Sequence, residues 1–178
     1  MRNRTLARLI TIFSLTGLLL VVTMMGISAS KEPSPDSAPP SPGFAVKIGI
    51  AVPLSGEVQS YGEEVRDGAL IPIREAQDAG WSIETVYGDT QCDAQQAVTV
   101  ADDLIQNHGV HYIIGAVCSS ASIAISEIAE ANGVVQISPT STRPEVTVNS
   151  DGTNKAYVFR APFLEPFQGK AMAAVALG

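Results

Sequence analysis

The stretch Tyr112-Ile-Ile-Gly-Ala-Val-Cys118-Ser-Ser120 contains a short apolar run that ends in glycine, followed by a cysteine and two serines. Behind it, apolar residues recur with helical spacing at Ala121, Ile125, Ile128 and Ala129. This pattern predicts a buried strand, a turn, and a helix that opens with hydroxyl side chains. The first N–H groups of a helix lack internal partners and carry a partial positive charge. The serines therefore either cap the helix or bind an anion at its start.

Strand-like and helix-like segments alternate along the chain on both sides of this stretch. The apolar runs predict strands at 45–52, 83–87, 110–115, 134–137 and 156–160. Apolar stripes predict helices at 61–79, from Asp93 to Gly109, at 121–132, and from near Phe167 onward. Strand and helix alternate four times along the chain, an order that is typical of a three-layer α/β domain with a mostly parallel sheet.

Hydroxyl-bearing residues gather in the loops that follow the predicted strands. In parallel α/β sheets, ligands bind outside the carboxyl ends of the strands. The four loops at that edge span 53–61, 88–92, 116–120 and 138–144. Their polar side chains fit a binding edge without a buried charge cluster, and they are Ser55, Tyr61, Ser119, Ser120, Thr140, Ser141 and Thr142.

The first 43 residues do not resemble the rest of the chain. Arg2, Arg4 and Arg8 precede a nearly uninterrupted apolar run, and the small residues Ser28-Ala-Ser30 follow it. This arrangement predicts a secretory signal peptide at 1–30, with an uncleaved membrane anchor as the alternative. Residues 31–43 are rich in proline and serine and predict a linker, so the folded domain is expected at 44–178.

Charge and cysteine content restrict the possible functions. The chain has 11 basic and 18 acidic residues; without the predicted signal peptide it would carry 8 basic residues and a net charge of −10. Such a surface disfavours nucleic acid and anionic lipid as partners. The two cysteines, Cys92 and Cys118, suggest a disulfide in an exported chain. His108 and His111 have no ligand partners at suitable spacing, so no metal site and no cofactor are expected.

Several stretches together resemble the leucine/isoleucine/valine-binding proteins of ABC transporters, the branched-chain amino-acid type of periplasmic solute-binding protein. The matching segments follow one another at family spacing from about residue 45 to the end of the chain. They are Lys47-Ile-Gly-Ile-Ala-Val-Pro-Leu-Ser-Gly56, Tyr61-Gly62, Cys92-Asp-Ala-Gln-Gln-Ala-Val98, 112–120, Ile137-Ser-Pro-Thr-Ser-Thr-Arg-Pro-Glu145, Phe159-Arg160 and Gln168-Gly169. Both cysteines lie at the family's disulfide positions.

The resemblance implies a fold and a set of site residues. The fold would be the first lobe of a type I periplasmic binding protein, and the chain would be a truncated product without the second lobe. By position, Ser119 holds the α-carboxylate of the ligand, Thr142 contacts both carboxylate and ammonium, the carbonyl of Thr140 accepts from the ammonium, and Tyr61 lines the side-chain pocket. Cys118 and Ser141, which lie in the same loops, are also expected to line the ligand site. Where relatives have small alanines, Thr140 and Ser141 make this pocket more polar, which admits ligands less aliphatic than leucine.

The resemblance therefore implies an exported binding protein that delivers an amino acid, or a related small amide, to the membrane permease subunits of an ABC importer. It would work in the periplasm or otherwise outside the cytoplasm. One alternative is the ligand-binding sensor domain of an exported receptor, since the same fold serves there. Another is an enzyme with Cys118 as nucleophile on a strand-to-helix turn.

Overall fold

The computed structural model describes residues 45–177. The predicted signal peptide at 1–30 and linker at 31–43 lie outside the described residues. The five strands are β1 (Val46–Val52), β2 (Ile83–Asp89), β3 (Tyr112–Gly115), β4 (Val135–Ser138) and β5 (Val158–Arg160). The α-helices are α2 (Gln59–Asp78), α3 (Ala94–Asp102), α4 (Ser119–Asn132) and α5 (Glu165–Leu177).

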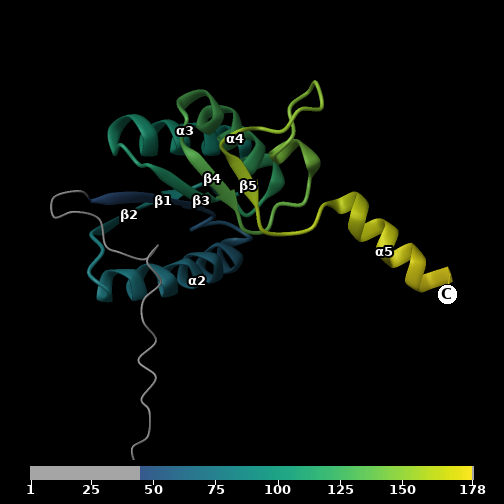
Figure 1. Ribbon diagram of the computed structural model, residues 1–178, viewed down its shortest axis with the longest axis horizontal. Helices are drawn as coiled ribbons and strands as arrows, with labels where there is room; N and C mark the ends of the chain where they lie inside the picture. The colour runs from purple at the N-terminus through teal and green to yellow at the C-terminus, as the bar shows by residue number, and fades with distance from the viewer. Residues whose placement is uncertain (1–44, 178) are drawn as a thin grey trace, which may run out of the picture. The chain divides into compact units, whose positions relative to one another are not determined.

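The strands form one sheet in the order β2-β1-β3-β4-β5, and every neighbouring pair is parallel. Helix α2 covers one face of the sheet, while α3 and α4 lie side by side on the other (Figure 1). The predicted three-layer α/β fold with a parallel sheet is therefore confirmed. In this strand order the chain reverses direction across the sheet at β1 and β3, which is where doubly wound folds bind ligands.

The alternation of side chains along β1 divides the core into two parts. Ile50 and Val52 point to one face and pack with Ile73 of α2. Ala51 points to the other face, where it packs in one cluster with Ala101 of α3 and Ile125 of α4. Because a strand in this position is buried on both faces, it reads as a nearly continuous apolar run.

Several element boundaries differ from the sequence predictions. Strand β2 continues through Asp89, so the loop predicted to start at residue 88 starts at Thr90. The helix predicted to run from Asp93 to Gly109 changes at Asp103 into a π-helical turn, Asp103–Asn107. Asp93 does cap α3, since its carboxylate accepts from Gln96 N at 2.8 Å. Helix α5 begins two residues earlier than predicted, at Glu165.

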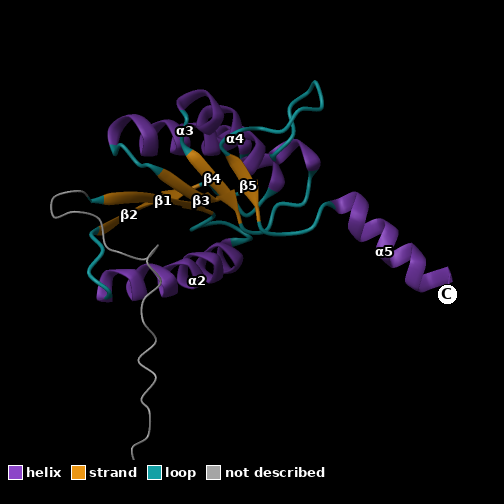
Figure 2. Cartoon of the chain, in the orientation of Figure 1, coloured by secondary structure: helices purple, strands orange, loops and turns teal. Residues whose placement is uncertain are grey.

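Part of the sheet and the last helix present apolar side chains to solvent. On the face that α2 occupies, Ile137 of β4 is 46% exposed and Phe159 of β5 is 51% exposed. Helix α5 buries no side chain and stands apart from the sheet (Figure 2). Within 45–177, no helix combines the length and the apolar character that crossing a membrane requires.

Candidate functional site

The turn between β3 and α4 is fixed by close backbone packing. Gly115 ends β3 with φ +141°, and a Cβ at this position would overlap the carbonyl oxygen of Ala51. Only glycine fits such an approach, because other residues both carry a Cβ and avoid that φ. The Gly115–Ala116 peptide bond is cis. The close approach of Gly115 to Ala51 places the chain for the first turn of α4 at the carboxyl edge of the sheet.

Ser119 and Ser120 are the first two residues of α4 rather than its caps. The N-cap is Cys118, and its side chain makes no capping hydrogen bond. Of the two possibilities left open by the sequence, capping by the serines is therefore not observed. Within the part of the chain that the structure describes, the Ser119 hydroxyl has no hydrogen-bond partner, while the helix start supplies unpaired N–H groups beside it. An incoming anion would meet both.

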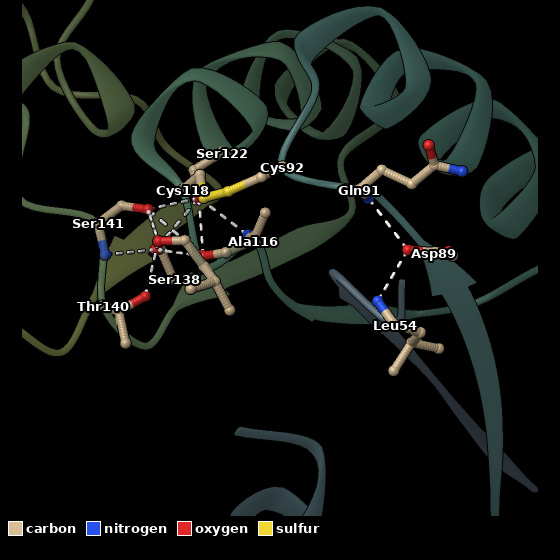
Figure 3. The surroundings of a disulfide bond; sticks show 11 residues. Leu54, Asp89, Gln91, Cys92, Ala116, Cys118, Ser122, Ser138, Thr140 and Ser141 are labelled. Atoms are coloured by element: carbon tan, nitrogen blue, oxygen red, sulfur yellow. Dashed lines mark hydrogen bonds between the residues drawn. A yellow bond between two sulfur atoms is a disulfide. The ribbon is translucent and has the colours of Figure 1, made fainter. Parts of the chain in front are cut away.

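A buried cluster of hydroxyl groups lies directly behind this turn. Ser122 Oγ accepts from Ala116 N at 2.8 Å and lies 2.7 Å from Ser141 Oγ and 3.3 Å from Ser138 Oγ. All three serines are at most 1% exposed. Figure 3 shows these side chains converging on the Ala116 backbone. These contacts join the end of β4 and the loop after it to the turn after β3. Each hydroxyl of the cluster has a polar partner, as buried polar groups in proteins usually do.

The predicted loop residues Thr140, Ser141 and Thr142 have three different environments. The Thr140 hydroxyl donates to Val117 O at 2.7 Å, so its loop lies against the turn that precedes Ser119. The Ser141 hydroxyl is buried in the serine cluster and faces the protein interior. The Thr142 hydroxyl donates to Glu165 Oε1 at 2.8 Å. The structure thus brings Thr140 next to the Ser119 turn and places Ser141 behind it.

Arg160 holds the same loop from the end of β5. Its Nη1 donates to Arg143 O at 2.7 Å and to Ser141 O at 3.3 Å, and its Nη2 donates to Pro144 O at 3.0 Å. Thr147 Oγ1 also accepts from Nη2, at 2.6 Å. A planar guanidinium can satisfy several carbonyls at once, which an ammonium cannot do with the same geometry. The loop that carries Thr140 and Thr142 is therefore fixed along its far side.

Asp89 joins the other two loops of the edge. Its carboxylate accepts from Leu54 N at 2.7 Å, Ser55 Oγ at 2.6 Å and Gln91 N at 3.0 Å. Partial burial would raise the pKa of Asp89, but the bonds from Ser55, Leu54 and Gln91 outweigh it and hold the pKa below its usual value. The ionised carboxylate thus ties the turn after β1 to the turn after β2.

A disulfide between Cys92 and Cys118 connects the two halves of the edge. Their Cα atoms are 5.4 Å apart, a usual separation for a disulfide. In Figure 3 the bond lies between the Asp89 contacts and the serine cluster. The predicted disulfide is confirmed. Because the Cys118 sulfur is bonded, the hypothesis of a Cys118 thiolate nucleophile has no thiol to use in this structure.

Tyr61 lies at the same edge but outside these hydrogen bonds. It belongs to the first turn of α2 and is 62% exposed. The next residue, Gly62, packs so closely on Pro53 O that a Cβ there would overlap the oxygen. This close packing fixes the first turn of α2, and with it the backbone of Tyr61, against the turn after β1. Among residues 45–177, no group of three or more His, Cys, Asp or Glu side chains is placed to hold a metal ion.

Three residues that organise the site were not among those predicted for it. Ser122 had a signal in the sequence, since it follows Ala121 on a face that the apolar spacing marks as buried. Arg160 had one too, as a lone cation at the end of an apolar strand. Asp89 had none, because its partners Leu54 and Ser55 are more than thirty positions away in the chain.

Comparison with known proteins gives one consistent family. A family model described as "Periplasmic binding protein" matches residues 45–177. The leucine-, isoleucine-, valine-, threonine- and alanine-binding protein of Pseudomonas aeruginosa is 38% identical over 130 residues, which are 70% of this chain and 33% of that protein.

Solved structures agree with this match. The leucine-binding protein LivK from Thermotoga maritima superposes with a TM-score of 0.67 at 37% identity, over 74% of this chain and 36% of that one. An ABC-transporter solute-binding protein from R. palustris in complex with benzoate gives a TM-score of 0.64 at 27% identity, over 72% and 35%. The chain thus spans about a third of the length of the proteins it matches. Because the family model covers all of the described residues, the chain belongs to the periplasmic binding protein family.

Proposed function

We propose that this chain forms the first lobe of an extracytoplasmic solute-binding protein that captures an amino acid for an ABC importer. The ligand would be of the branched-chain type or a related small amide. Its partners would be the membrane permease subunits of that importer. Export through the signal peptide predicted at 1–30 would bring the protein to the periplasm or its equivalent.

One observation carries the proposal: the Thr140 loop is hydrogen-bonded to the turn that delivers Ser119 to the start of α4. A helix N-terminus with a serine hydroxyl suits a carboxylate without any lysine or arginine. Hydroxyls and a carbonyl alongside, at Thr140 and Thr142, suit an ammonium. A zwitterion needs both kinds of partner within a few ångströms, and this edge offers them on neighbouring loops.

The side-chain end of the ligand would lie toward Tyr61, which the structure leaves exposed above the β1 turn. Ser141 is better suited to a supporting role than to ligand contact, since its hydroxyl is buried in the serine cluster. The disulfide would limit relative motion of the two halves of the site, because it crosslinks the loops after β2 and β3.

Calorimetric titration of the full-length protein tests the proposal. L-leucine, L-isoleucine and L-valine, together with benzoate and acetamide as non-amino-acid probes, cover the ligand classes considered. Saturable binding of at least one amino acid is expected. Binding of benzoate alone, or of none of these compounds, would contradict amino-acid capture.

A transport assay separates the importer from the sensor alternative. Deleting the gene should abolish uptake of the radiolabelled ligand identified by calorimetry, and restoring it should recover uptake. Unchanged uptake, combined with a lost transcriptional or motility response to that ligand, would favour a receptor domain.

A further inference from the structure

Thr142 and Glu165 form a two-point contact between the loop after β4 and the start of α5. The Thr142 hydroxyl donates to Glu165 Oε1 at 2.8 Å, and Glu165 N donates back to Thr142 O at 3.0 Å. The backbone bond fixes the position of Glu165 beside the loop, and the side-chain bond fixes its carboxylate against Thr142. Glu165 was not among the residues predicted from the sequence for the site.

The proton count of this contact decides what Thr142 can still do. A threonine hydroxyl has one proton to donate, and a carboxylate only accepts. With its proton directed to Glu165, Thr142 Oγ1 can offer only lone pairs to anything else. It can therefore accept from an ammonium group but cannot donate to a ligand carboxylate.

The charge of Glu165 acts in the same direction. Nearby, Arg143 is paired with Glu145 at 3.3 Å and Arg160 donates to backbone carbonyls and to Thr147. Among the described residues no cation forms an ion pair with Glu165, and the residue is exposed. Its negative charge is therefore available to whatever lies beside Thr142.

We propose that Glu165 is a specificity-determining residue of this site, selecting zwitterionic α-amino acids over carboxylates that lack an amino group. It holds Thr142 as a pure acceptor and adds a negative charge next to the ammonium position. This inference rests on the proposed function and identifies the ligand class within it. It assigns the discrimination to the first residue of α5.

The variant Glu165→Gln isolates the charge, because glutamine keeps an amide oxygen that can accept from Thr142. The two ligands to be compared are L-leucine and isocaproate, which has the carbon skeleton of leucine without the amino group. Calorimetry on the full-length protein gives the ratio of the affinity for L-leucine to the affinity for isocaproate. We expect this ratio to fall about tenfold in Glu165→Gln, chiefly through weaker L-leucine binding, as a charge-assisted contact becomes a neutral one.

Two further variants control the experiment. Glu145→Gln removes the same charge from the neighbouring loop and should leave the affinity ratio within about twofold of wild type, since Glu145 is paired with Arg143. Glu165→Asp keeps the charge and should retain most of the preference for L-leucine. An affinity ratio in Glu165→Gln equal to that of wild type overturns the assignment of Glu165 alone. Failure of the wild-type protein to bind L-leucine or any other amino acid overturns the proposed function as well.

Discussion

The guanidinium of Arg160 donates to Thr147 Oγ1 at 2.6 Å, across a loop whose backbone it also holds at three carbonyls. The loop that Arg160 holds runs from Ser141 to Thr147, so it contains Thr142 and directly follows Thr140. One side chain at the end of β5 therefore sets the shape of a segment that the site depends on, although it does not itself face the ligand position.

Replacing Arg160 by lysine should loosen this loop. Lysine has an ammonium in place of the planar fork and cannot reach the same set of acceptors. We expect Arg160→Lys to lower the free energy of unfolding by about 1–3 kcal/mol and to weaken amino-acid binding, as measured by urea denaturation and calorimetry. Arg143→Lys is the matched control, because the Arg143 side chain makes one exposed contact, with Glu145. Equal effects of the two substitutions would refute the role assigned to Arg160.

Removing the Ser122 hydroxyl should destabilise the turn before α4. Ser122→Ala leaves Ala116 N without its buried acceptor and deprives Ser141 of its nearest partner. The expected loss is about 1–3 kcal/mol of unfolding free energy, the cost of leaving buried polar groups unpaired. Ser120→Ala, at the exposed second position of α4, should change stability by less than about 0.5 kcal/mol. A Ser122→Ala protein as stable as wild type would show that the serine cluster is not needed.

Breaking the disulfide should destabilise the edge that it spans. Cys92→Ser, Cys118→Ser and the double variant should each lose roughly 2–5 kcal/mol, and the double variant should lose no more than the single ones. Thermal unfolding followed by circular dichroism, with and without reductant, measures this. An unchanged melting temperature on reduction of the wild-type protein would contradict the structural role of Cys92–Cys118.

Asp89 makes stability depend on pH in a defined direction. Its folded-state pKa is lowered, so its stabilising contribution is complete above the unfolded-state value of about 3.9 and is lost as the pH falls through the lower folded-state value. Asp89→Asn should be less stable than wild type at neutral pH by about 1–3 kcal/mol. The difference should shrink below pH 4 in denaturation curves. Asp102→Asn, an exposed site on α3, is the control and should show neither effect.

The fold was predictable from the sequence because its signals are local. The apolar run of 46–52, the glycines after the helices and the helical stripe from Ala121 onward each identify an element without reference to the others. Boundaries were less predictable where tertiary contacts set them. Strand β2 extends to Asp89 because it pairs with β1 along its whole length, through Val52, and no local pattern marks that pairing.

The site was predictable only in part. Resemblance to known proteins indicated Ser119, Thr140 and Thr142, and the structure brings their loops to one edge of the sheet. It could not indicate that Ser141 is buried. The sequence of a polar loop does not show whether a hydroxyl faces solvent or the protein interior. Nor could the resemblance indicate Asp89 as an organising residue, because its partners Leu54 and Ser55 are distant in sequence and lie beside it only once the sheet has formed.

We propose that the first turn of α4 holds the carboxylate of an amino acid through Ser119. Titration of the full-length protein with L-leucine, comparing wild type with Ser119→Ala and with Ser120→Ala, tests it most directly. Ser119→Ala should weaken binding by about 1.5–3 kcal/mol, the range for a hydrogen bond to a charged group, while Ser120→Ala should bind nearly as wild type does. Equal affinities for wild type and Ser119→Ala would show that Ser119 does not hold the carboxylate.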